Sequence, residues 1–222
     1  MSTGRVLMPA RRSFLSRVTV GAAAFSAVGG AVRPARAESG AFQPAKHAQD
    51  DWLDQLPGKH RFVLDTTTPA AADEVRRFVA NFFAGNKSGY GLDPGELAVV
   101  VILRHHSTPF AFRDAMWAKY GAAVSEELKF TDPRTSRAPT TNVYNASDNA
   151  FDALAERGVH FAVCAMATRF FAGIAAAKSG GNSDAVYQEL VANLIGNAHM
   201  VPAGIVAVNR AQEHGYSFGF VG

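Results

Sequence analysis

The chain has almost no cysteine, since Cys164 is the single one among 222 residues. One cysteine excludes an internal disulfide, and it excludes the Cys-x-x-Cys spacing of zinc ribbons and dithiol redox sites. No two histidines have the i, i+4 spacing of a helical metal site either. We therefore expect no metal and no other cofactor, although a mixed His and Cys site for copper or haem, assembled in space, stays open.

Long apolar runs and phosphate-binding motifs are also missing. The apolar stretch over residues 18–32 has 15 residues, fewer than the ~20 that a membrane-spanning helix needs. The later sequence has no longer candidate, no fixed-period repeat and no low-complexity tract. The Gly-Leu-Asp-Pro-Gly segment at 91–95 precedes a predicted strand instead of following one, so it does not resemble a dinucleotide fingerprint.

The N-terminal region combines the parts of an export signal. Residues 11–16 read Arg-Arg-Ser-Phe-Leu-Ser, a twin-arginine pattern, and the weakly apolar stretch follows. Ala35-Arg36-Ala37 then matches a signal-peptidase site. We expect a twin-arginine signal peptide over residues 1–37, cleavage after Ala37 and a periplasmic protein. A tether over 38–58 and one domain over 59–222 would follow.

Cleavage would change the charge of the protein. Six of the 22 Lys and Arg residues and none of the 19 acidic residues lie in the first 37 positions, which leaves 16 basic and 19 acidic residues and a formal charge of −3. The whole-chain pI of about 9.2 therefore reflects the leader. This balance gives no support for nucleic-acid binding or for a basic membrane surface.

Strand and helix patterns alternate after the leader. Short apolar runs predict strands over residues 61–65, 97–103, 160–163, 198–201 and 216–221. Helical patterns fall over residues 70–84, 110–120, 121–128, 148–157, 165–178, 183–195 and 202–213, with an irregular excursion over 131–145. This alternation predicts a three-layer α/β/α domain with a five-stranded, mainly parallel sheet, flavodoxin-like in outline.

Right-handed crossovers would bring the strand-to-helix loops to one edge of that sheet. These loops are residues 66–68, 105–108, 164–167 and 202–204. Cys164 ends a strand and begins a helix, where the positive end of the helix dipole favours a thiolate. A buried cysteine that acts as a small apolar side chain is the competing interpretation.

Other candidate site residues lie in the same loops. In extended backbone His105 and His106 would point to opposite sides, so we expect the pair to be a poor metal chelate. One of the two would face the pocket near Cys164 as an acid–base or cation partner, or it is a surface or interface residue. Pro202 and Gly204 belong to the last of these loops. Arg169 would assist an anion, or it is an ordinary solvated helix charge. For His160 and His199, inside strands, we expect packing and not ligation.

Two segments carry a resemblance to a known family. Residues 156–164, Glu-Arg-Gly-Val-His-Phe-Ala-Val-Cys, resemble the central signature of the DsrE/DsrF-like sulfur-relay family. Residues 201–218 resemble the ending of that family, with Val-Pro-Ala-Gly opening a helix and Gly-Tyr-Ser-Phe starting the last strand. The resemblance covers residues 60 to 222 and implies a homo-oligomer whose cysteine, here Cys164, accepts sulfur as a persulfide.

The resemblance thus implies a sulfur-handling protein, with a donor or acceptor protein or a small sulfur compound as its partner. The export signal and the excursion over 131–145 depart from the cytoplasmic relay members. The alternative is a non-catalytic module that binds a small ligand or assembles with other chains and keeps an inert, buried cysteine. No second thiol or acid–base pair that would mark a turnover enzyme is evident in the sequence.

Overall fold

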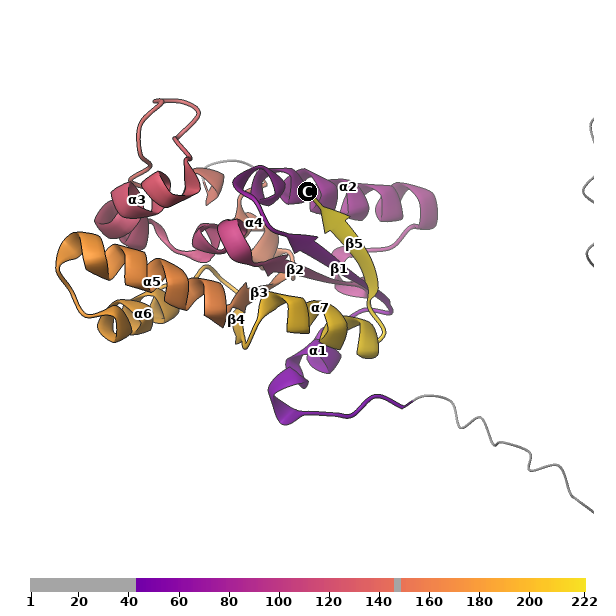
Figure 1. Ribbon diagram of the computed structural model, residues 1–222. Helices are drawn as coiled ribbons and strands as arrows, with labels where there is room; N and C mark the ends of the chain where they lie inside the picture. Colours follow the sequence, from indigo (N-terminus) through magenta and orange to yellow (C-terminus); the bar gives the residue numbers. More distant parts are fainter. Residues whose placement is uncertain (1–42, 146–148) are drawn as a thin grey trace, which may run out of the picture. The chain divides into compact units, whose positions relative to one another are not determined.

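The computed structural model describes residues 43–145 and 149–222, so the predicted export signal over residues 1–37 lies outside the described residues. Within these two ranges, five strands form one sheet in the order β4-β3-β2-β1-β5 (Figure 1). The strands are β1 (His60–Thr66), β2 (Leu97–Leu103), β3 (His160–Cys164), β4 (Ala198–Val201) and β5 (Ser217–Val221). The predicted sheet is confirmed, and every strand pair in it is parallel.

The helices and helical turns lie between the strands. The α-helices are α1 (Trp52–Gln55), α2 (Pro69–Tyr90), α3 (Asp114–Leu128), α4 (Phe151–Glu156), α5 (Ala165–Ser179), α6 (Ser183–Ala192) and α7 (Gly204–Glu213). Four 3₁₀ turns in the described ranges are η1 (Ala48–Asp50), η2 (Pro94–Glu96), η3 (His105–Ala111) and η4 (Val143–Asn145). Among the described residues, no helix has both the length and the apolar character needed to cross a bilayer.

The helices cover both faces of the sheet, because the chain reverses its direction across the sheet once. From β1 to β4 the chain moves outward one strand at a time, so right-handed crossovers place α2, α3 and α5 on one face. Helix α7 then connects β4 at one edge to β5 at the other edge, and it lies on the opposite face with α1 (Figure 1). The protein is therefore a three-layer α/β/α domain, as predicted.

Strand β2 is central, and its seven residues are all buried. Val99, Val101 and Leu103 pack under the α2, α3 and α5 layer. Val100 and Ile102 pack under α1 and α7. The uninterrupted apolar run over 97–103 thus reflects a strand covered on both sides, as parallel sheets require.

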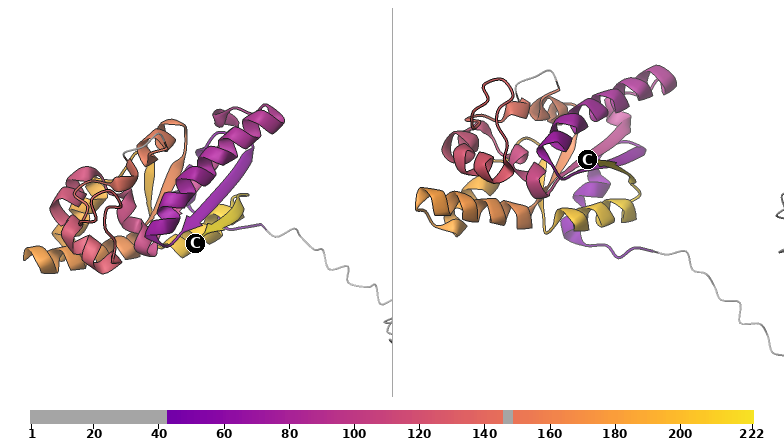
Figure 2. Two further views of the ribbon diagram at one scale, coloured as in Figure 1. Left: turned by 90° about the horizontal axis from the view of Figure 1, so that it is seen from above. Right: turned by 45° about the horizontal axis from the view of Figure 1, so that its top comes forward.

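Several predicted helix limits differ from the observed ones. Helix α2 continues to Tyr90, past the limit predicted at residue 84 and through Gly85 and Gly89, and it ends at Gly91, which has a φ of 72°. The two glycines have no neighbouring atoms that a Cβ would meet. The far end of α2 projects past the sheet (Figure 2). Burial of Val75, Val79 and Phe83 outweighs the cost of two glycines, about 1 kcal/mol each.

The segment between β2 and β3 also differs from its prediction. The helix expected over 110–120 and the one expected over 121–128 are a single helix, α3, which follows the 3₁₀ turn η3. The last part of the irregular excursion packs against the domain: Asn142 is 1% exposed and donates hydrogen bonds to the carbonyl oxygens of Phe110 and Phe112. Tyr144 donates a hydrogen bond to the carbonyl oxygen of Pro69 at the start of α2.

The structure differs from the tether expected over 38–58. From Ala48 on, the chain forms η1 and α1, and Leu53 and Leu56 are buried against the second face of the sheet. Tyr216 at the approach to β5 donates a hydrogen bond of 2.8 Å to the carbonyl oxygen of Leu53. This part of the segment therefore belongs to the folded domain.

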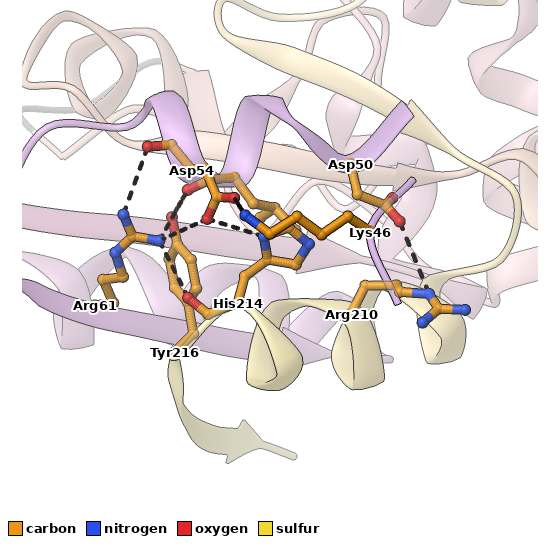
Figure 3. A network of polar contacts seen from close by, with 8 residues as sticks. Lys46, Asp50, Asp54, Arg61, Arg210, His214 and Tyr216 are labelled. Carbon is orange, nitrogen blue, oxygen red and sulfur yellow. Dashed lines mark hydrogen bonds and ion pairs between the residues drawn. The ribbon is translucent and has the colours of Figure 1, made fainter. Parts of the chain in front are cut away.

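Polar contacts attach the same segment to the C-terminal part of the chain (Figure 3). Asp54 of α1 lies 2.9 Å from Nδ1 of His214 and 3.3 Å from the guanidinium of Arg61 (Figure 3). The hydrogen bond with His214 is the largest of the causes that lower the pKa of Asp54. Burial raises the pKa of Tyr216 to about 12. Residues near both ends of the described chain thus hold one another in place.

Candidate functional site

A pocket of about 650 Å³ opens at the carboxyl ends of β2, β3 and β4. It forms where the connections diverge, because β3 continues into α5 on one face and β4 continues into α7 on the other. Ligands of open α/β sheets bind at such switch points. The lining residues are Arg104, His105, His106, Cys164, Met166, Ala167, Phe170, Ala203, Gly204 and Ile205.

Cys164 is a buried residue that lines this pocket. It is the last residue of β3 and the N-cap of α5, where its Sγ accepts a hydrogen bond from the backbone N–H of Ala167 at 3.4 Å. Its exposed fraction is 7%, and that remainder faces the pocket. Thr168 donates a 2.9 Å hydrogen bond to the carbonyl oxygen of Cys164 and fixes the first turn. The sulfur thus has the surroundings that stabilise negative charge at a helix N-terminus.

Arg104 supplies a fixed positive charge to the pocket. Its Nε and Nη2 donate hydrogen bonds of 2.8 Å each to the two carboxylate oxygens of Asp65, which is 2% exposed. These bonds raise the pKa of Arg104 above its usual value, and the nearby Cys164 acts in the same direction. Bidentate pairing fixes the guanidinium in place. A fixed cation beside the thiol favours an anionic reactant or product.

Gly204 brings the start of α7 close to this arginine. A Cβ at position 204 would overlap the Cβ of Arg104, so only glycine allows this approach. Gly204 lines the pocket as predicted, whereas Pro202 is exposed beside it and is not among the lining residues.

His105 and His106 both line the pocket. The prediction that they point to opposite sides is wrong, because the chain turns into η3 at this point and His105 has a φ of 56°. Their rings are stacked, with centroids 4.0 Å apart and planes inclined by 12°. Burial lowers the pKa of His106, and the neighbouring His105 lowers it further. The pocket therefore holds two imidazoles beside the guanidinium.

Two buried hydroxyl groups hold this turn in place. Ser107 Oγ accepts a hydrogen bond from the backbone N–H of Arg104 at 3.0 Å and another from Thr66 Oγ1 at 2.9 Å. It also lies 2.9 Å from the carbonyl oxygen of Thr66, at the end of β1. The end of β1 thus fixes the start of η3 and, with it, the backbone of Arg104.

Arg169 does not reach the pocket. Its guanidinium lies 4.0 Å from the ring centroid of Tyr187 and 3.5 Å from Asp184, so it faces α6. This position agrees with the alternative expectation, that Arg169 is an ordinary charged residue of the helix. Arg104 is the arginine that faces the thiol, and the prediction from sequence missed it. The available signal was an acidic residue at the end of one strand and a basic residue at the end of the next.

The outer rim of the pocket is apolar. Met166, Phe170 and Ile205 are 68%, 51% and 60% exposed, and all three line the pocket. Such exposed apolar groups beside a polar interior mark a site that contacts a ligand or another protein.

His160 and His199 lie elsewhere, on the face that α1 covers. Nδ1 of His160 and Nε2 of His199 are 2.8 Å apart, and Trp52 stacks on His199 with ring centroids 4.0 Å apart. Burial lowers the pKa of His199 to about 4, and His160 adds to this effect. Across residues 43–145 and 149–222, no group of three or more His, Cys, Asp or Glu side chains is placed to hold a metal ion.

No protein-family model and no curated protein matches this chain. Its function must therefore be inferred from the pocket itself.

Proposed function

We propose that the protein handles sulfane sulfur and that Cys164 accepts it as a persulfide. One observation carries this proposal: the only thiol of the chain lies at the start of α5, in a pocket that also holds the fixed guanidinium of Arg104. Both features stabilise negative charge on sulfur. The resemblance of residues 156–164 and 201–218 to the DsrE/DsrF-like sulfur-relay family supports the same chemistry. Together with the predicted export signal, it favours a periplasmic carrier.

With thiosulfate as the donor, the step balances without an oxidant. The Cys164 thiolate attacks the outer sulfur, an Sγ–S bond forms, and the S–S bond of thiosulfate breaks. The electron pair leaves with sulfite, and the total charge is unchanged. A partner thiolate then attacks the outer sulfur of the persulfide and carries it away, which regenerates the Cys164 thiolate. Arg104 favours the anionic donor and the anionic persulfide.

The test is the intact mass of the reduced, folded protein after exposure to thiosulfate or polysulfide. We expect the mass of one added sulfur atom, which a reductant removes and which Cys164→Ser lacks. Far-UV circular dichroism would verify that the variant folds. A gain that occurs only in denaturant would overturn the proposal and show that the folded pocket does not admit the donor.

The size of the pocket favours one alternative function. A volume of about 650 Å³ with an apolar rim lies within the range of small-molecule sites, roughly 300–1,000 Å³, and far exceeds what thiosulfate fills. A binding module would therefore take an organic anion, with its charge at Arg104 and its apolar part against Phe170. In that case ligand binding would survive Cys164→Ser, whereas sulfur transfer would not.

A further inference from the structure

Among the described residues, strand β5 forms one edge of the sheet and has a neighbouring strand on one side only. It pairs with β1 on one side, and no described element pairs with its other side (Figure 1). Its sequence, Ser-Phe-Gly-Phe-Val, has none of the lysine, proline or inward-facing charge that natural edge strands use against pairing. The main-chain groups on this side are thus available to a further strand.

Aromatic side chains flank this edge on both faces. Phe218 and Phe220 are 44% and 55% exposed on the face of α7, because their partners in register, Val63 and Asp65, belong to that face. On the other face, Phe62 packs against Phe82 of α2, with ring centroids 5.1 Å apart.

Phe78 is a further exposed aromatic residue on α2, the helix that packs against Phe62 through Phe82. It precedes Phe82 by one helical turn and is 42% exposed, so it continues the aromatic surface on the same side of the helix.

Strand β4, at the opposite edge of the sheet, is covered on its faces by other parts of the chain. In β4, His199 lies under Trp52 on one face, whereas Ala198 and Met200 pack against the core on the other face. Both faces of β4 are therefore covered by the same chain. Of the two edge strands of the described sheet, only β5 presents large exposed apolar side chains.

The sequence of β5 is self-complementary in an antiparallel pair. A twofold axis through Gly219 would place Phe218 opposite Phe220 of the second copy and Gly219 opposite its own equivalent. All four phenylalanines would then lie on one face, where cross-strand aromatic pairs stabilise sheets. Glycine at the axis allows close approach of the two backbones, and the ring of Phe62 already fills the space beside Gly219.

We infer that β5 pairs with β5 of a second copy of this chain and forms a continuous ten-stranded sheet across a twofold axis. This inference is independent of the chemistry at Cys164. The four half-exposed phenylalanines of the two copies provide about 400 Å² of buried surface, if each covered ring contributes ~150–250 Å² when fully buried. This area is below the roughly 1,200 Å² of stable specific interfaces, so the dimer is weak and reversible.

The first test is sedimentation equilibrium of the full chain over concentrations of about 1 to 200 µM, the range in which a reversible dimer of this size dissociates. Phe220→Glu should weaken dimerisation at least tenfold, because it places an unpaired carboxylate opposite the ring of Phe218 of the second copy. Phe170→Glu is the matched control, since Phe170 is 51% exposed but lies at the pocket rim. A monomer at all concentrations, or dissociation caused by Phe170→Glu instead, would overturn the inference.

The second test determines the register of the pair formed by the two β5 strands. In a Cys164→Ser background, a mixture of Phe218→Cys and Phe220→Cys chains should form an intermolecular disulfide faster than either variant alone. Opposed residues of an antiparallel pair lie about 4.5–5.5 Å apart at Cα, within the range of a disulfide. Equal rates of disulfide formation in all three samples would contradict the pairing centred on Gly219. If residues 1–42 of the same chain cover the edge instead, the sedimentation experiment would show a monomer at all concentrations.

Discussion

Arg104 is the residue on which the electrostatics of the pocket depend. Asp65 holds its guanidinium through two hydrogen bonds, and Gly204 leaves room for its aliphatic part. The cation therefore keeps its position without a ligand. Preorganised charge of this kind stabilises a developing anion without reorganisation during the reaction.

The first prediction concerns this charge. Arg104→Gln should slow persulfide formation from thiosulfate by about tenfold to a hundredfold, because one charge-assisted hydrogen bond contributes ~1.5–3 kcal/mol. The rate is followed by intact mass. Arg169→Gln removes an arginine of α5 that faces Tyr187, and it should leave the rate unchanged.

A neutral reagent distinguishes the effect of the Arg104 charge from a change in the access of reagents to Cys164. At a pH that fully ionises the thiol in both proteins, alkylation of Cys164 by iodoacetamide should change little in Arg104→Gln, because loss of the cation then no longer lowers the thiolate fraction. If persulfide formation from thiosulfate and alkylation by iodoacetamide slow by the same factor, the substitution has closed the pocket. The electrostatic role of Arg104 is then refuted. A thermal melt belongs with this experiment, since breaking the pair leaves Asp65 buried without its cation and costs about 3–5 kcal/mol.

Helix α2 shows how an element tolerates residues that disfavour it. Gly85 is exposed inside the helix, and a Cβ added there would meet no other atoms, whereas Gly91 ends the helix at a positive φ. The same residue type thus has opposite effects at positions six residues apart. Inside the helix glycine only raises the entropic cost of folding, but at the end it adopts a conformation that other residues resist.

The second prediction follows from this contrast. Gly85→Ala should raise the free energy of unfolding by about 0.5–1 kcal/mol, since it restricts the unfolded chain and adds no clash. Gly91→Ala should lower it by about 1 kcal/mol, because the left-handed conformation strains alanine. Urea denaturation of both variants measures the two changes. A stabilising effect of Gly91→Ala would contradict the C-terminal capping of α2.

At the scale of the whole molecule, the ends of the described chain stabilise one another. Helix α1 contacts β4 through Trp52 and His199, and it contacts the approach to β5 through Asp54, His214 and Tyr216. The second face of the sheet is therefore covered by residues from near both ends. Conditions that loosen α1 should expose this face.

The third prediction is a loss of stability in acid. The pKa of His199 is about 4 in the folded protein and about 6.5 when unfolded, so the unfolded state binds more protons between these values. This contribution to stability is complete above pH 6.5 and is lost as the pH falls to 4. We expect a loss of about 1–2 kcal/mol, because the half-buried ring is partly screened by solvent.

Thermal or urea unfolding between pH 7 and pH 4 measures this effect. His199→Phe keeps an aromatic ring under Trp52 and removes the titration, so it should flatten the profile. His60→Gln, at an exposed position, removes one histidine and should leave the slope as it is. An unchanged slope in His199→Phe would assign the acid sensitivity to other groups, among them Asp54, whose lowered pKa also makes stability fall in acid.

Local sequence patterns predicted the five strands, most of the helices and the three layers. The apolar run over 97–103 predicted a buried central strand, and the alternation of strand and helix patterns predicted a parallel sheet covered on both faces. These patterns also placed Cys164 at a strand end and a helix start. These features follow from local periodicity and from the handedness of crossovers, which apply to any chain.

The contacts between side chains that are distant in sequence could not be predicted from these patterns. Asp65 and Arg104 are 39 residues apart in sequence, and they pair because β1 and β2 are neighbours in register. His105 and His106 point the same way because a hydrogen bond between Thr66 and Ser107 fixes a turn where extended backbone was expected. Helix α1 packs on a face that exists only once the sheet has formed. Contacts between distant residues depend on register and direction, which local periodicity does not encode.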